Sequence, residues 1–182
     1  MAEVRSGSFK TSGYSDPGWP DHYVFSWELT SQSIEGNYSD IKWSLTARGT
    51  NVGSGNFTNV KEKYVTVNGT TQSNATLQTT YSGTVPFSGT SRIYHNSAGA
   101  GSFSASAGGA FFYYGSYNTT GKGTWDLPAI QRATTPVLAT TNITMGASVN
   151  ITLTPENNTF KHKIRYDFGT ISGSAEGISI GY

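Results

Sequence analysis

The chain has 182 residues, a formal net charge of +1 and no cysteine, and only 13% of its residues are charged. Globular proteins average about 25% charged residues, so serine, threonine, asparagine and glycine must supply most of the polar surface. No run of lysine and arginine forms the basic face that nucleic-acid binding requires. No apolar stretch approaches the roughly 20 residues that span a bilayer. We therefore expect neither nucleic-acid binding nor membrane insertion.

The same composition predicts an all-β protein. Threonine, tyrosine, phenylalanine, tryptophan and valine favour strands, whereas glycine and asparagine favour the turns between them. This mixture is typical of a β-sandwich or barrel and leaves little room for helices. The absence of cysteine excludes a disulfide framework and a thiolate metal site. It is typical of a protein that folds in a reducing cytoplasm before release.

The first clear strand lies near the N-terminus, where alternating apolar residues share one face: Tyr23, Phe25, Trp27 and Leu29. Successive side chains of a strand point to opposite sides, and the next strand repeats the pattern with Ile41, Trp43 and Leu45. We interpret the polar segment Gln32–Asp40 as the loop between the two strands. An antiparallel pair would then place Trp27 and Trp43 in one core.

Further strands are predicted at residues 4–14, 61–68, 72–81, 84–95, 101–107 and 120–127. The dipeptide Asn68-Gly69 is a strong signal for a tight turn. This number of short strands within residues 1–128 suits a jelly-roll-like antiparallel β-sandwich. We expect the core of this first domain to contain Phe25, Trp27, Trp43, Leu45 and Trp125.

A domain boundary is predicted at residues 129–136, which lie between Pro128 and Pro136 and show little periodicity. Proline lacks the amide that a sheet needs, so we interpret this segment as a linker that limited proteolysis should cut near Arg132. Residues 137–182 would form a small immunoglobulin-like β module, with strands around 148–153 and 160–168. So short a unit is marginal as an independent core; it is either very small or cut short at Tyr182.

Several segments are strand-and-turn motifs without catalytic residues: Arg92–Asn96, Gly101–Ser104, Tyr117–Trp125 and Leu127–Pro136. A later one, Thr159–Gly169, looks like the start of a repeat module. Together these segments resemble distal-tail and minor structural proteins of siphophages that infect streptococci and other Firmicutes. The resemblance implies an outward-facing virion protein of the distal tail, with β-sandwich modules in series, contacts to other tail proteins and a role in host-surface attachment. A homotrimer would strengthen host attachment through effective concentration.

No catalytic motif is present. The sequence has no serine nucleophile elbow and no HExxH pair, and its acids are scattered rather than set as the two flanking carboxylates of a glycosidase. The histidines are His22, His95 and His162, and we expect His162 to pack on the apolar face of its strand. We therefore expect a protein that is not an enzyme.

One loop combines acids with an aromatic ring, because Asp16 and Asp21 flank Trp19. Two carboxylates five residues apart could hold a hard cation such as calcium through oxygen ligands. The favoured interpretation is two solvated turn acids. No other metal and no cofactor is expected.

The aromatic run Phe111–Tyr117 is the sharpest local feature. Alternation puts Phe111 and Tyr113 on one face and Phe112 and Tyr114 on the other, so at least one pair should be core. The other pair could stack on the C–H faces of sugars while hydroxyl groups form hydrogen bonds. The candidate ligand-binding residues are therefore Trp19, Tyr113, Tyr114 and Tyr117.

Three functions are compatible with these observations. The first is a tail-tip or fibre protein that attaches the phage to a host cell-surface polysaccharide or another receptor. The second is a tail protein that acts only as a structural spacer. The third is a carbohydrate-binding module of a bacterial surface protein or secreted enzyme. Binding of the purified protein to host cells would separate the first function from the second.

Overall fold

The computed structural model describes residues 3–13, 20–49, 57–112, 116–132, 137–138, 151–152, 162–168 and 171–178. Strands are the only regular elements among them, and these residues include no helix with the length and apolar character to cross a membrane. The chain divides into two compact units, Met1–Ile130 and Gln131–Tyr182. The division falls within the segment 129–136 that the sequence marks as a linker.

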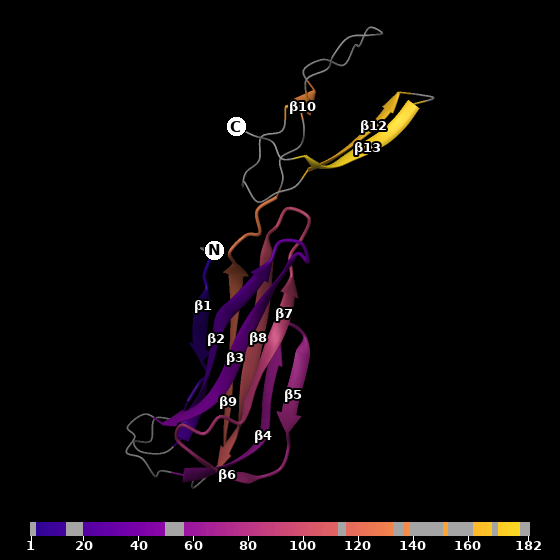
Figure 1. Ribbon diagram of the computed structural model, residues 1–182. Helices are drawn as coiled ribbons and strands as arrows, with labels where there is room; N and C mark the ends of the chain where they lie inside the picture. Colours follow the sequence, from indigo (N-terminus) through magenta and orange to yellow (C-terminus); the bar gives the residue numbers. More distant parts are fainter. Residues whose placement is uncertain are drawn as a thin grey trace. The chain divides into compact units, whose positions relative to one another are not determined.

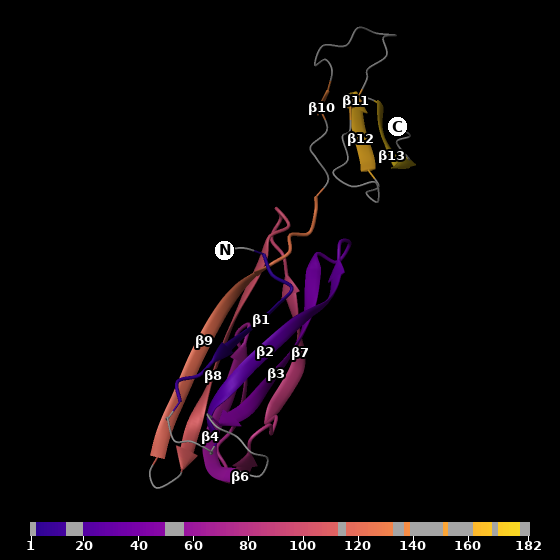
Figure 2. The same cartoon turned by 90° about the vertical axis from the view of Figure 1, so that its left-hand side faces the viewer.

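The described residues of the first unit form nine strands: β1 (Ser6–Lys10), β2 (Pro20–Ser33), β3 (Tyr38–Gly49), β4 (Phe57–Val67), β5 (Thr70–Asn74), β6 (Gln78–Tyr81), β7 (Phe87–Tyr94), β8 (Gly101–Phe112) and β9 (Ser116–Leu127). They form two antiparallel sheets, seen in Figures 1 and 2. Sheet A has the strand order β1-β2-β3-β7, and sheet B has the order β5-β4-β8-β9 with β6 also paired to β4. The predicted all-β antiparallel sandwich is confirmed.

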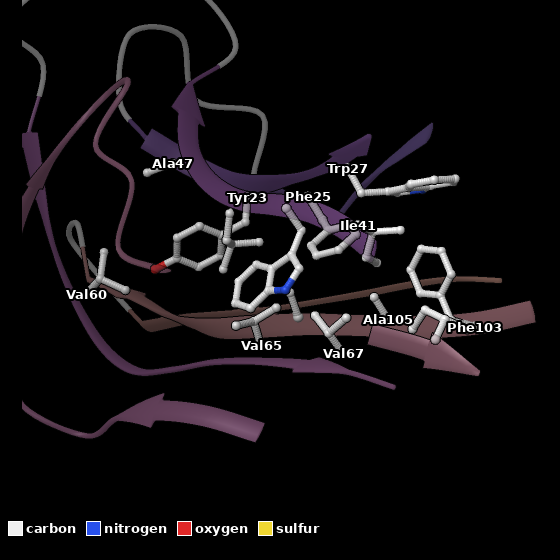
Figure 3. Close-up of a cluster of buried hydrophobic side chains, with 14 of the residues drawn as sticks. Tyr23, Phe25, Trp27, Ile41, Ala47, Val60, Val65, Val67, Phe103 and Ala105 are labelled. Atoms are coloured by element: carbon white, nitrogen blue, oxygen red, sulfur yellow. The ribbon is translucent and has the colours of Figure 1, made fainter. Parts of the chain in front are cut away.

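The core lies between the two sheets (Figure 3). Four of the five predicted core residues, Phe25, Trp27, Trp43 and Leu45, are buried, and Trp125 is partly buried against them. The ring of Phe25 stacks at 6.1 Å on Trp43 and at 5.9 Å on Trp125. Such aromatic contacts add to the free energy that burial of their apolar area supplies. The alternation read from the sequence therefore placed these side chains on the correct face.

The predicted loop Gln32–Asp40 is wrong, because β2 and β3 run through most of it. Gln32 pairs with Ser39, and Ser33 pairs with Tyr38, so only residues 34–37 make the turn. The strands here extend beyond the apolar core, and their polar side chains bond to one another instead of packing. The amide of Gln32, for example, donates to the hydroxyl of Ser39 at 3.1 Å.

The predicted strand at 72–81 is interrupted, so that β5 ends at Asn74 and β6 begins at Gln78. Both strands pair with β4, which has an irregular register between Lys61 and Tyr64. The side chain of Lys63 is buried and donates to the carbonyl groups of Val60 at 3.3 Å and Thr76 at 3.4 Å and to Gln78 Oε1 at 3.0 Å. Lys63 therefore ties β4 to the β5–β6 connection.

The predicted tight turn at Asn68-Gly69 is confirmed. It joins β4 to β5, and both residues have positive φ, 47° and 83°. Positive φ at both central positions is the requirement of a two-residue hairpin turn. Asn and Gly adopt it at little steric cost.

The two lateral edges of the sandwich differ. At one edge, β1 of sheet A meets β9 of sheet B: the N–H of Val4 donates to the carbonyl of Asp126 at 3.0 Å, and that of Ser12 to the carbonyl of Thr120 at 2.9 Å. We call this the closed edge. At the other edge lie β7 of sheet A and β5 of sheet B, which do not pair with each other in the described residues. We call this the open edge.

The second unit contains the short pair β10 (Val137–Leu138) and β11 (Ile151–Thr152) and the hairpin β12 (His162–Phe168) and β13 (Ile171–Ile178), both antiparallel. The predicted strands around 148–153 and 160–168 overlap with β11 and β12. The burial of the apolar face of β12, including His162, stays a prediction, as does the immunoglobulin-like character of this unit.

Candidate functional site

The outer face of sheet A carries polar rows that cross the strands. One row consists of serines, because the register pairs Ser8 with Ser26, Ser26 with Ser44 and Ser44 with Ser88. Small side chains leave a shallow hollow of ≈ 380 Å³ on this face. Its lining is Ser6, Ser26, Trp27, Glu28, Lys42, Trp43, Ser44 and Ser88. We call it the serine hollow.

The next rows carry charges in opposite pairs. Glu28 lies directly opposite Lys42 in the register of β2 and β3. One row further, the guanidinium of Arg92 donates from Nε to Asp40 Oδ1 at 2.9 Å and from Nη2 to Asp40 Oδ2 at 3.1 Å. This hydrogen bond from Arg92, together with its charge, lowers the pKa of Asp40, and the hydrogen bond with Asp40 raises the pKa of Arg92. Both groups are therefore ionised at neutral pH.

Two tyrosines form the last row, because Tyr38 of β3 pairs with Tyr94 of β7. Their rings meet edge to face, with centroids 6.1 Å apart and an interplanar angle of 74°. The guanidinium carbon of Arg92 lies 3.6 Å from the centroid of the Tyr38 ring, which is within the range of a cation–π contact. Tyr94 is 69% exposed. We call Tyr38, Asp40, Arg92 and Tyr94 the tyrosine cluster.

The end of β7 that carries the cluster is held in place by His95 and Asn37. The N–H of His95 donates to the carbonyl of Asn37 at 2.9 Å, and the amide of Asn37 donates back to the carbonyl of His95 at 2.7 Å. The buried ring of His95 lies 2.7 Å from the carbonyl of Gly99 through Nδ1 and 2.7 Å from the hydroxyl of Ser39 through Nε2. His95 is therefore a structural residue that fixes the position of its neighbour Tyr94.

A second hollow, of ≈ 210 Å³, lies at the open edge. Its lining is Trp43, Val67, Asn68, Thr70, Gln72, Thr90, Ser91 and Arg92. In the register of β4 with β5, the buried Val65 pairs with Gln72 and the buried Val67 pairs with Thr70. The side chains of β5 are therefore polar where those of β4 are apolar. The indole N–H of Trp43 donates to the hydroxyl of Ser91 at 3.0 Å. Arg92 belongs both to this edge hollow and to the tyrosine cluster.

Most of the ligand-binding residues predicted from the sequence lie outside the described residues. This holds for Trp19, Tyr113 and Tyr114. Tyr117 lies on β9, opposite Phe111, and is partly buried. Phe111 itself is buried and packs at 4.9 Å against Tyr23, so one residue of the aromatic run belongs to the core.

The possible calcium site is also described only in part, because Asp16 lies outside the described residues. Asp21 is buried, and its carboxylate contacts Nδ1 of His22. Among the residues that the structure describes, no three or more acids, histidines or cysteines come together as metal ligands.

The tyrosine cluster was missed by sequence reasoning. Tyr38 and Asp40 lie in the segment that was interpreted as a loop. Arg92 and Tyr94 lie in the predicted strand 84–95, but the sequence does not show which strand lies beside it. The available signal was alternation: Tyr38, Asp40, Lys42 and Ser44 follow one another at every second position of β3. Continuing the strand pattern N-terminally from Ile41 would have placed them on one outward face.

Comparison with known protein families gives one family match. Residues 22–179 match the family described as "Siphovirus protein of unknown function (DUF859)". No curated protein and no solved structure matches the chain. The match confirms the phage part of the resemblance seen in the sequence, whereas the streptococcal host and the distal-tail position stay predictions. Because the match covers most of its length, the chain belongs to this family of siphovirus proteins.

Proposed function

We propose that this protein is a structural component of the phage virion, in the tail tip or fibre, that attaches the phage to a polysaccharide or another receptor on the host surface. The observation that carries the proposal is the exposed Tyr94 ring of the tyrosine cluster, which lies on a polar sheet face of a siphovirus protein. The proposed role involves no catalysis.

The cluster has properties that a packing role does not require. Tyr94 is 69% exposed at the end of an edge strand, yet its neighbours fix its backbone through His95 and Asn37. Tyrosine supplies a large, stiff contact surface with a polar tip and loses little conformational entropy on binding. A prearranged ring of this kind favours association with a partner.

A spacer role in the tail is the second candidate, and a different region favours it. Leu77, Tyr81 and Val85 are 52%, 51% and 49% exposed, respectively, and lie on or beside β6. Large apolar side chains that are exposed within one short segment of the chain suit a contact with another protein, here another subunit of the tail. The siphovirus family favours both tail roles over a module of a bacterial enzyme.

Cell binding tests attachment. The biotinylated 182-residue chain would be displayed on fluorescent streptavidin, because display on a tetramer raises weak single-site affinity through effective concentration. We expect saturable labelling of host cells, loss of labelling on mutants that lack the surface polysaccharide, and inhibition of phage adsorption by excess protein. If the tetramers label no host cells and leave adsorption unchanged, the attachment role is wrong and the spacer role is favoured.

A further inference from the structure

We propose that the outer face of sheet A binds an uncharged polysaccharide chain that lies along β3 and β7, from the serine hollow to the tyrosine cluster. This inference rests on the proposed attachment role and adds the site and the class of ligand. It is carried by three properties of the segment between the serine hollow and the tyrosine cluster: its length, its hydroxyl lining and the balanced charge of its rows.

The length of the face suits an extended ligand. Ser44 lines the serine hollow, and Tyr38 lies six positions earlier on the same strand and on the same face. A strand rises about 3.3 Å per residue, so the two ends of the face are about 20 Å apart. A hollow of ≈ 380 Å³ at one end and an exposed aromatic ring at the other provide two contact points for one linear chain.

The lining of the hollow suits hydroxyl groups. Ser26, Ser44 and Ser88 cross the sheet in one row, and Thr90 follows Ser88 on the same face of β7. Each hydroxyl can donate one hydrogen bond and accept two, which matches a ligand that is itself rich in hydroxyl groups. Tyr94 would add the apolar contact, because an aromatic ring packs well on the C–H face of a sugar.

The charges of the face argue for an uncharged ligand. Within these rows, Glu28 stands opposite Lys42, and Asp40 forms two hydrogen bonds with Arg92. The Arg92 guanidinium is in addition stacked on the ring of Tyr38. Proteins that bind phosphate present arginine forks that are free to bind two oxygens. Here a phosphate group would have to displace Asp40, so the face favours neutral sugars over polymers with phosphodiesters.

The test uses the full chain and two wall polymers purified from the host: the uncharged polysaccharide and a polymer that carries phosphodiesters. Binding would be measured at 50 and 500 mM salt. We expect binding of the uncharged polymer, with a Kd that changes less than about twofold between the two salts, because screening acts only on charge–charge attraction. Binding of the phosphodiester polymer that falls steeply with salt would overturn the proposal.

Variants locate the site. Tyr94→Ala removes the exposed ring, and Ser44→Lys and Ser88→Lys each fill the serine hollow. Each should weaken binding about tenfold or more, as for a central contact residue. Ser104→Lys is the matched control for the lysine variants, because Ser104 is exposed but lies on β8 of sheet B, and it should bind as the wild type does. Equal melting temperatures would show that all variants are folded.

Asp40→Asn tests whether the pairing of Asp40 with Arg92 prevents the binding of phosphodiester polymers. The substitution leaves Arg92 without its carboxylate partner, so the variant should gain salt-sensitive binding to the phosphodiester polymer that the wild type lacks. If it gains none, the pairing of Asp40 with Arg92 does not set the ligand class.

The outcomes separate this inference from the attachment role. If wild-type protein labels host cells while Tyr94→Ala, Ser44→Lys and Ser88→Lys label them equally well, attachment stands and this site is wrong. If binding is competed by an extended peptide instead of by the polysaccharide, the occupant is a strand added to the edge of β7, and the ligand class is wrong. If wild-type protein labels no cells, the attachment role itself fails.

Discussion

The closed and open edges of the sandwich differ in how the backbone groups of their edge strands are paired. An edge strand exposes unpaired N–H and C=O groups that attract other chains. At the closed edge, Val4 and Ser12, which lie just before and just after β1, donate backbone hydrogen bonds to β9 and so join the two sheets. At the open edge, β7 and β5 stay apart in the described residues, and a polar hollow lies beside them. The difference predicts that the closed edge contributes more to stability than the open edge does.

The packing of side chains also differs between the closed and the open edge. At the closed edge, Gly7 lies so close to the indoles of Trp27 and Trp125 that an added Cβ would be 2.8 Å and 2.5 Å from their Nε1 atoms. At the open edge, the positions of β5 that pair with buried valines are the exposed Thr70 and Gln72. Substitutions of packed side chains should therefore lower stability most at the closed edge, whereas substitutions of exposed side chains beside the open edge should mainly weaken the proposed binding.

The largest loss of stability is expected for Trp125→Ala at the closed edge. The Trp125 ring packs against Phe9, Phe25, Trp27 and Phe103. Removing such a side chain costs its transfer free energy and leaves a cavity, so the free energy of unfolding should fall by about 3 kcal/mol. Urea denaturation followed by fluorescence or circular dichroism would measure it. A loss below about 1 kcal/mol would show that β1 and β9 contribute little to stability.

A smaller loss of stability is expected for Lys63→Met. Lys63 lies on β4 and holds the connection between β5 and β6 in place. Lys63 is 2% exposed and donates to three oxygen acceptors. Methionine leaves these buried acceptors without a donor, which should lower the free energy of unfolding by about 1–3 kcal/mol. The amide hydrogens of β5 should also exchange faster. Unchanged exchange in β5 would contradict the tie between Lys63 and the open edge.

The same lysine predicts a pH dependence. Burial lowers the pKa of Lys63, so the unfolded chain binds this proton more tightly than the folded chain does. The free energy of unfolding should therefore rise with pH between the lowered pKa and the ordinary lysine value of about 10.4. Lys63→Met should lack this rise, and urea titrations at a series of alkaline pH values would compare the two proteins.

Thr119→Val should have a moderate effect at the closed edge. The hydroxyl of Thr119 donates to Thr11 Oγ1 at 2.9 Å, and Thr11 Oγ1 also accepts the N–H of Tyr23 at 2.9 Å. Valine keeps the shape and removes one buried hydrogen bond, which should lower the free energy of unfolding by about 1 kcal/mol. Thr124→Val, on the exposed face of the same strand, is the control and should change stability less.

The smallest stability change is expected for Tyr94→Ala. Exposed positions away from the core usually change stability by less than about 0.5 kcal/mol, and Tyr94 is 69% exposed. The melting temperature of this variant should therefore match that of the wild type while its binding is weakened. A large stability loss would assign the ring to packing and remove the main reason to consider it a contact residue.

The core could be read from the sequence because alternation within one strand is a local property. Phe25, Trp27, Trp43 and Leu45 are correctly placed by their spacing alone. The turn at Asn68-Gly69 was equally local. The hairpin end around Tyr38 was misread, because polar residues were taken as a loop signal although the strands continue beyond the core.

The candidate site could not be read in this way, because it depends on pairing between distant strands. Asp40 meets Arg92, and Tyr38 meets Tyr94, only through the register of β3 with β7. Nothing in a single strand shows which strand lies beside it. The serine hollow has the same origin, since its row combines β1, β2, β3 and β7. Local patterns therefore predicted the strands and the side chains that face the core. The candidate site depends on which strands pair with one another.

The central claim is that sheet A binds the host polysaccharide through its outer face, and a nuclear magnetic resonance titration tests it most directly. The isotope-labelled full chain would be titrated with the uncharged wall polysaccharide. We predict chemical-shift changes at Asp40–Ser44 and Ser88–Tyr94 and none at Ser104 and Lys122 on the outer face of sheet B. Shift changes confined to sheet B, or to the neighbourhood of Tyr117, would contradict the account.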